Sequence, residues 1–234
     1  MNSKNFLIVG GSYGIGNSIV RNLAKEGHQV YVISRTDGEL TQMPNIIHLK
    51  NDILNEEINN SQLPEAIHGL AYCIGSINLK PFRSLKEADF LNDFQLNALG
   101  AIRSIKAVFK QLKKAETASV VLFSTVAVQQ GMPFHASVAA AKGAVEGLTR
   151  SLAAEWAPKI RVNCIAPSLT DTPLANRLLS TPEKKEAAGN RHPLKRVGTA
   201  DELGQIATFL LSEKSSWITG QIIGVDGGLS SLKV

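Results

Sequence analysis

The sequence predicts an α/β fold in which helices cover both faces of a doubly wound parallel sheet. Short, continuous apolar segments alternate along the chain with helical patterns, which indicates strands buried on both faces and joined by crossover helices. The 234 residues, 44% of them hydrophobic, fit one well-cored α/β domain. No linker, repeat or change of composition divides the sequence, so residues 1–234 are interpreted as a single domain.

Seven apolar segments are the candidate strands, because each is a short run of aliphatic or aromatic residues bounded by turn residues. In chain order they are Phe6–Val9, Gln29–Ile33, Ile46–Leu49, Gly69–Ile74, Ser119–Phe123, Ile160–Ile165 and Gln221–Val225. Residues 36–44 are too few for a full crossover helix, so a loop or a single turn is expected there.

Helical periodicity is clearest in three segments. The first helix follows a glycine-rich stretch and runs to about Glu26. Residues 98–112 carry one apolar stripe, whereas residues 138–156 carry an apolar stripe and a second stripe of small side chains. The second stripe would permit close approach of another helix, so a homodimer or homotetramer built on these two helices is expected. Its members are Ala140, Ala144, Gly147 and Ser151.

The segment 174–197 is expected to form a mobile lid over a ligand pocket. It connects the last predicted strands and contains few signals of regular structure. Three apolar side chains are predicted to face the pocket, namely Leu174, Leu178 and Leu179.

Composition argues against several classes of protein. No apolar run reaches the roughly 18 residues of a membrane helix, and the start of the chain lacks signal-peptide features, so a cytoplasmic protein without a membrane partner is expected. The net charge of +5 comes from scattered lysines and arginines, which does not indicate a nucleic-acid partner. Cys73 and Cys164 lie in apolar runs and are expected to be free thiols. No metal site is predicted.

A glycine-rich loop directly follows the first predicted strand and opens the first helix. Glycines permit a tight turn and let the backbone approach a pyrophosphate, whose charge is stabilised by free N–H groups at the helix N-terminus. The position of the loop between strand and helix favours dinucleotide binding over a purely structural turn. The predicted contacts are Gly10, Ser12, Tyr13, Gly14, Ile15 and Gly16.

The end of the second predicted strand bears on the choice between NADP(H) and NAD(H). Proteins that prefer NAD carry an acidic residue there for the ribose 2′-hydroxyl, whereas an arginine accepts a 2′-phosphate. This chain has Ser34 followed by Arg35, so NADP(H) is favoured, with a charge-assisted contact from Arg35 and a hydroxyl contact from Ser34. The alternative is an ordinary surface arginine, with Asp37 as the acidic residue for NAD(H).

The chain resembles the short-chain dehydrogenase/reductase family over nearly its whole length. The similar stretches are residues 9–16, 51–53, 72–75, 96–98, 160–168, 217–221 and 225–228. The resemblance implies a Rossmann-type fold and an asparagine of the active site at Asn97. Ser168 stands where the family has glycine. The further cofactor contacts that the resemblance implies are Asp52, Ile53, Gly75, Lys142, Pro167, Leu169 and Thr172.

The resemblance also implies a catalytic set of Ser, Tyr, Lys and Asn, with Tyr and Lys four residues apart on one helix face. Lys142 matches the lysine, but Val138 stands at the tyrosine position. The three tyrosines of the chain are Tyr13, Tyr31 and Tyr72, so none of them fills that position. Valine cannot supply the proton that a carbonyl oxygen needs when hydride arrives.

Other groups are candidates for the remaining chemistry. The spacing to Val138 favours Thr125 as the hydroxyl of the catalytic set, with Ser124 as the second candidate. The alternative is that the hydroxyl only forms a hydrogen bond to the backbone. Water, Lys142, Thr125 or His135 are considered as proton donors. A position such as that of His135, near a helix start, is more often a local hydrogen-bonding site.

Two functions therefore compete at the level of the sequence. The first is an NADP(H)-binding oxidoreductase that acts on a carbonyl or alcohol with an altered proton pathway. The second is a cofactor-binding protein without ordinary turnover, such as a sensor, scaffold or subunit partner. An engineered substitution at Val138 is a third explanation. The persistence of Asn97, Thr125 and Lys142 favours the oxidoreductase, because a scaffold would not need them.

Overall fold

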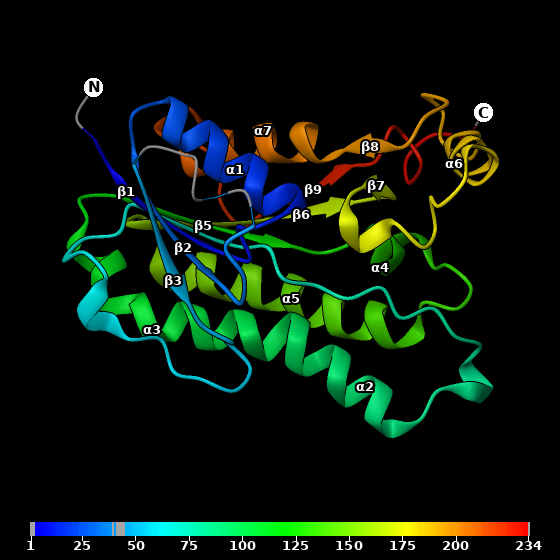
Figure 1. The fold of residues 1–234 in the computed structure, drawn as a ribbon, viewed down its shortest axis with the longest axis horizontal. Helices are drawn as coiled ribbons and strands as arrows, with labels where there is room; N and C mark the ends of the chain where they lie inside the picture. The colour runs from blue at the N-terminus through cyan, green and yellow to red at the C-terminus, as the bar shows by residue number, and fades with distance from the viewer. Residues whose placement is uncertain (1–2, 39, 41–44, 234) are drawn as a thin grey trace.

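The computed structural model describes residues 3–38, 40 and 45–233. A central sheet is covered by helices on both faces (Figure 1). Its strands within the described residues are β1 (Asn5–Val9), β2 (Gln29–Ser34), β3 (Ile46–Lys50), β4 (Gly69–Tyr72), β5 (Ala118–Phe123), β6 (Ile160–Pro167) and β9 (Ile222–Val225).

All neighbouring strands of this sheet are parallel, in the order β3-β2-β1-β4-β5-β6-β9. The chain builds outward from β1 to one edge and then from β4 to the other, which is the doubly wound arrangement. The predicted α/β fold class is confirmed. The predicted strand 69–74 is too long, because pairing with β1 and β5 stops by Tyr72 and the chain then turns along the ligand cavity.

One face of the sheet is covered by α1 (Gly14–Lys25) and α7 (Ala200–Leu211), which lie side by side (Figure 1). Fully buried aliphatic side chains such as Ile8, Ile19 and Leu203 fill the space between these helices and the strands. Alternate strand residues face this layer, because successive side chains of a strand point to opposite faces. This packing holds the start of α1 against the end of β1.

The other face is covered by α3 (Gly100–Lys114) and α5 (Ala136–Trp156), and α2 (Glu87–Phe94) packs on α5 (Figure 1). Between α2 and α3 lies a π-helical turn, Gln95–Leu99, so the helical path is longer than the predicted segment 98–112. The predicted helix 138–156 begins two residues earlier than expected, at Ala136.

Smaller elements complete the fold. A second, two-stranded sheet pairs β7 (Thr170–Asp171) with β8 (Gly198–Thr199), which the sequence analysis missed because both strands are very short. The segment 174–197 contains α6 (Pro182–Gly189), so it is not the irregular loop that we expected. The remaining short helices are α4 (Ala127–Gln130), Asn60–Gln62, Phe82–Ser84, Pro173–Ala175 and Glu213–Ser215.

Several other expectations can be compared with the described residues. Cys73 and Cys164 are both free thiols. In the described part of the chain, no helix combines the length and apolar character needed to cross a bilayer, and no cluster of His, Cys, Asp and Glu side chains could hold a metal ion. The expected turn at 36–44 includes residues 39 and 41–44, which lie outside the described residues.

Candidate active site

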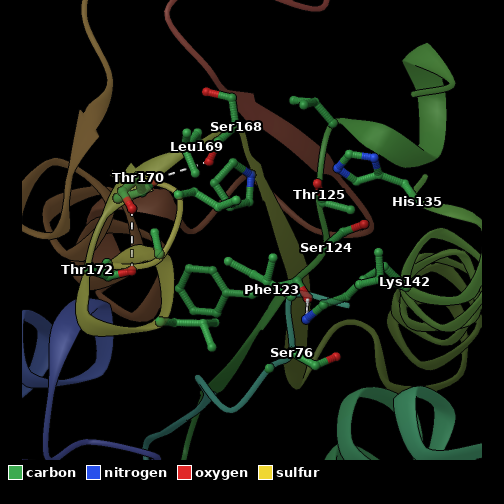
Figure 2. Close-up of a pocket in the computed structure, with 18 of the residues that line it drawn as sticks. Ser76, Phe123, Ser124, Thr125, His135, Lys142, Ser168, Leu169, Thr170 and Thr172 are labelled. Carbon is green, nitrogen blue, oxygen red and sulfur yellow. Dashed lines mark hydrogen bonds between the residues drawn. The ribbon is translucent and has the colours of Figure 1, made fainter. Parts of the chain in front are cut away.

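A cavity of about 330 Å³ opens at the carboxyl ends of the central strands. Its wall combines side chains that follow β5 and β6 with side chains of α5 and of the segment after β7, as Figure 2 shows. Ligands of doubly wound sheets bind at this end of the strands, where the strand order reverses. Thr125, Val138, Lys142, Ser168 and Thr172 all line the cavity, so the fold brings together residues from four segments of the chain.

The glycine loop forms a tight turn that leaves no room for side chains. Gly10 has φ +85°, and a Cβ atom there would lie 2.8 Å from Ile74 Cγ1. A Cβ atom on Gly16 would lie 2.2 Å from the carbonyl oxygen of Gly10. The first turn of α1 contains no acidic residue, and Tyr13 gives no side-chain cap, so the N–H groups of this turn remain available to an anion. These features fit a dinucleotide pyrophosphate.

The end of β2 presents one free cation. Arg35 is exposed and has no hydrogen bond or ion pair with the rest of the described chain. Ser12 donates its hydroxyl proton to the Thr36 carbonyl, and Ser34 donates to the same oxygen at 2.9 Å. His48 Nε2 lies 2.9 Å from the Ser34 hydroxyl and 3.2 Å from the Ser34 carbonyl oxygen. Arg35 therefore offers a charged contact, whereas the Ser34 hydroxyl is engaged in local hydrogen bonds.

The segment after β3 forms a compact turn. The Asp52 carboxylate accepts hydrogen bonds from the Leu54 N–H at 3.2 Å and from the Asn55 side chain at 2.9 Å. Ile53 is buried. These bonds stabilise the turn that carries Asp52 and Ile53, the two predicted cofactor contacts of this segment.

Lys142 is deeply buried and points across the cavity. Its Nζ donates a hydrogen bond of 2.7 Å to the Phe123 carbonyl (Figure 2). Burial lowers the pKa of Lys142 from 10.5 to about 8, although interactions with Cys164, Cys73 and Asp93 oppose the shift. Nζ lies beside Gly75, because a Cβ atom added to Gly75 would lie 3.4 Å from Nζ. Lys142 is thus placed to bind a polar group of a ligand in the cavity.

Asn97 lies in the π-helical turn between α2 and α3. Its amide nitrogen donates to the Ser76 hydroxyl and to the Asp93 carbonyl, each at 2.8 Å. Its Oδ1 atom is buried without a hydrogen-bond partner and lies near Gly75, on the same side as Lys142 Nζ. A buried acceptor left without a partner is costly, so this oxygen fits a site that a ligand or water completes.

The two hydroxyls after β5 have different partners. Ser124 is buried and donates its proton to the Glu146 carboxylate at 2.8 Å. Thr125 Oγ1 accepts the N–H of Ala127 at 3.3 Å, which leaves its own proton free to donate. Both residues border the cavity, but Thr125 is the one whose hydroxyl remains available to a substrate.

Val138 and His135 lie at the start of α5. Val138 is 5% exposed and lines the cavity one turn before Lys142, so an apolar group occupies the position that the family resemblance gives to tyrosine. His135 also lines the cavity, and its Nδ1 lies 2.7 Å from the Pro133 carbonyl. This bond agrees with the expected local hydrogen-bonding role at a helix start.

The residues after β6 complete the wall. Pro167, Leu169 and Thr172, the three predicted cofactor contacts of this segment, line the cavity, and Thr172 packs beside the glycine loop, because a Cβ atom on Gly14 would lie 3.4 Å from its Cβ. Of the three leucines expected to face inward, Leu174 and Leu178 line the cavity. Leu179 is not among the residues that line the cavity. Ala175, which is almost fully buried, lines it in this region.

The sequence analysis missed one pair of functional groups. His192 is 3% exposed, and its Nε2 lies 2.9 Å from the Ser168 hydroxyl. Both residues line the cavity. In the sequence, the only indication of this pair is Ser168, which stands where the family resemblance implies glycine. His192 lies 24 residues later, in the segment interpreted as a loop, so only the tertiary structure brings the two together.

The doubly wound sheet, the glycine loop and the cavity beside it define a dinucleotide-binding oxidoreductase domain. A family model described as enoyl-(acyl carrier protein) reductase matches residues 10–230. The chain belongs to the short-chain dehydrogenase/reductase family, which confirms the resemblance.

Relatives and solved structures agree with this assignment. A tropinone reductase homolog from Arabidopsis thaliana is 32% identical, with 97% of this chain and 92% of the relative aligned. The structure of ElxO with NADP bound is 27% identical and has a TM-score of 0.89, covering 99% of this chain and 100% of that chain. A gluconate 5-dehydrogenase from Burkholderia cenocepacia, in complex with NADP and tartrate, is 26% identical with a TM-score of 0.89, covering 100% and 97%.

Proposed function

We propose that this protein is an NADP(H)-dependent oxidoreductase that interconverts a small carbonyl compound and its alcohol, with a proton donor other than tyrosine. One observation carries the proposal. Thr125 and Lys142 line a single cavity beside the glycine loop, the Oδ1 atom of Asn97 lies near Gly75 of the cavity wall, and each of the three residues keeps a polar atom free for a ligand. A protein that only bound a cofactor would not need Thr125 in this arrangement.

The roles of the residues follow from their atoms. NADPH, when bound, supplies the hydride. The glycine loop and the start of α1 would hold the pyrophosphate, and Lys142 would bind a hydroxyl group of the cofactor or substrate. Thr125 would donate its free proton as a hydrogen bond to the substrate carbonyl and so polarise it. Val138 excludes water from one side of the site, but it contributes no proton.

NADP(H) is proposed over NAD(H) on the basis of charge. Arg35 is exposed at the end of β2, where it could form an ion pair with a 2′-phosphate. Two solved structures similar to this chain contain NADP, which supports the same preference.

The competing proposal is a cofactor-binding protein without turnover. The observation in its favour is the apolar Val138 beside Lys142, because loss of a positioned proton donor reduces rates by about 10²–10⁴-fold. Orientation of the substrate still accelerates hydride transfer without that donor, which is why we prefer an enzyme with an altered pathway.

The deciding experiment is steady-state NADPH oxidation over a panel of aldehydes and ketones, with the parent, Val138→Tyr and Val138→Phe. We expect measurable turnover in the parent and a gain of about 100-fold in Val138→Tyr, since the phenol would restore a proton donor four residues before Lys142. Val138→Phe is the control for side-chain size and should show no gain. NADPH binding without oxidation of any carbonyl by the parent would favour the competing proposal.

A further inference from the structure

Ser168 lies next to Thr125 at the mouth of the central sheet. The backbone pairing of β5 and β6 continues past the ends of the strands, because the Val126 N–H donates to the Pro167 carbonyl at 3.1 Å. Paired strands lie about 4.8 Å apart, so the residues next to this bond, Thr125 and Ser168, are close neighbours. Both line the cavity (Figure 2). Thr125 and Ser168 therefore border the same cavity from neighbouring strand ends.

The hydrogen bonds of His192 define which nitrogen can exchange a proton. Its Nδ1 lies 3.0 Å from the Ala188 carbonyl, which can only accept, so Nδ1 carries a hydrogen in every protonation state. Its Nε2 lies 2.9 Å from Ser168 Oγ. The exchangeable proton of His192 is thus directed at the Ser168 hydroxyl, and the imidazole is held there by almost complete burial.

The Ser168 hydroxyl has two orientations that depend on the charge of His192. When the imidazole is neutral, Ser168 donates to Nε2. When the imidazole is charged, Nε2–H donates to Ser168, and the serine proton is free to turn into the cavity. Gly227 packs against His192 and helps to hold the side chain in this position.

We propose that Ser168 and His192 form the proton relay of this enzyme, an inference that rests on the proposed oxidoreductase function. In the direction of reduction, the substrate carbonyl carbon gains a hydride from NADPH, and the carbonyl oxygen takes the proton of the Ser168 hydroxyl. Ser168 Oγ takes the Nε2 proton of His192, which becomes neutral and later recovers a proton from water. The products are the alcohol and NADP⁺, and in oxidation the same proton moves in reverse.

The relay differs from the other candidates in its contacts. His135 bonds to the Pro133 carbonyl, and within the described residues no hydroxyl links its imidazole to the cavity centre. Lys142 already donates to the Phe123 carbonyl. Ser168 and His192 form the pair in which a hydroxyl at the cavity is bonded directly to a buried imidazole, the arrangement that general acid–base catalysis requires.

The test compares His192→Gln, Ser168→Ala and Ser168→Thr with the parent. Glutamine can still bond to Ser168 but cannot exchange a proton, so His192→Gln should lower kcat for carbonyl reduction about 100-fold while the KM for the carbonyl changes little. Ser168→Ala should fall similarly, and Ser168→Thr should retain most of the activity because it keeps the hydroxyl. His68→Gln, which lies at the other end of β4 and outside the cavity lining, is the matched control and should retain the parental kcat, whereas His135→Gln tests the alternative donor.

Two further measurements separate a relay from a structural role. NADPH affinity, measured by fluorescence, should be unchanged in the variants, and their melting temperatures should show that they fold. Long-range ¹H–¹⁵N spectra of the parent should show neutral His192 protonated at Nδ1, with the Nε2 resonance shifted by Ser168→Ala.

Three results would overturn the relay. The first is full kcat in both His192→Gln and Ser168→Ala. The second is loss of kcat in His135→Gln alone, which would make His135 the donor. The third is a neutral His192 protonated at Nε2. A parent that binds NADPH but reduces no carbonyl would instead contradict the proposed function, and the relay with it, so the two failures are distinguishable.

Discussion

Arg35 is the residue that carries the proposed preference for NADP(H). A charge-assisted hydrogen bond contributes about 1.5–3 kcal/mol, and the exposed position of Arg35 places its effect at the lower end because solvent screens it. We expect Arg35→Ala to weaken NADPH binding roughly tenfold and to leave NADH binding nearly unchanged. Fluorescence titration with both cofactors measures this, and Arg83→Ala, another exposed arginine, is the control. Equal losses for NADPH and NADH would contradict the assigned role.

Lys142 makes the stability of the protein depend on pH in a direction that the structure specifies. Burial lowers its pKa from 10.5 to about 8 in the folded protein, so between these values the unfolded chain holds a proton that the folded chain has lost. Unfolding then takes up a proton and becomes less favourable as the pH rises. We expect the free energy of unfolding to increase from pH 8 to 10.5 by up to roughly 3 kcal/mol from this group.

The comparison with Lys142→Met isolates that effect from the other titrating groups. Urea unfolding of the cofactor-free proteins, measured from pH 7.5 to 10.5, should show a rise in the parent relative to the variant. Parallel curves for the two proteins would mean that the amine of Lys142 titrates at its ordinary pKa in the folded state.

At the scale of an element, the π-helical turn Gln95–Leu99 is held in place by Tyr72. The Tyr72 hydroxyl donates to the Leu96 carbonyl at 2.6 Å, and a Cβ atom on Gly100 would lie 2.0 Å from that hydroxyl oxygen. The turn positions Asn97 beside the cavity. Tyr72 stands where the family resemblance implies asparagine. Its role here is structural and differs from a contact with the cofactor.

This arrangement predicts a non-additive pair of substitutions. Tyr72→Phe should cost about 1 kcal/mol of stability through the lost hydrogen bond, and Gly100→Ala about 1–3 kcal/mol through overpacking. Gly100→Ala should cost less when Tyr72→Phe is also present, because the clashing oxygen is gone. Chemical denaturation measures all three proteins. Gly143→Ala in α5 is the control and should be tolerated, because a Cβ atom there would lie 3.8 Å from the nearest neighbouring side chain. Strictly additive losses of stability in the double variant would argue against the contact between Tyr72 and Gly100.

At the scale of the whole molecule, the second stripe on α5 is largely open within the described residues. Ala140, Gly147 and Ser151 are exposed, whereas Ala144 is partly buried against the core. We predict a dimer or tetramer in light scattering at micromolar concentration, converted to smaller species by Ser151→Arg because the charge would be buried at the contact. Gln205→Arg, on the exposed side of α7, is the control. A strictly monomeric parent would remove the prediction.

Much of the fold could be predicted because its signals are local. Continuous apolar strands and the glycine loop between β1 and α1 are readable from neighbouring residues, and their predicted positions agree with the structure to within two residues, with the largest differences at the ends of β4 and β6. The strands β7 and β8 and the helix α6 escaped because two-residue strands and a short polar helix lack periodicity. Family membership was confirmed from the same local motifs.

The amino-acid sequence by itself determined the layered α/β fold, the position of the dinucleotide loop and the absence of tyrosine four residues before Lys142, since each depends on residue types at short spacing. Only the tertiary structure decided the partners of the reactive groups. In the folded chain, Ser124 donates its proton to Glu146, the Thr125 hydroxyl keeps its proton free to donate, and His192 lies against Ser168. Such contacts depend on the packing of distant segments around one cavity, and no local pattern records them.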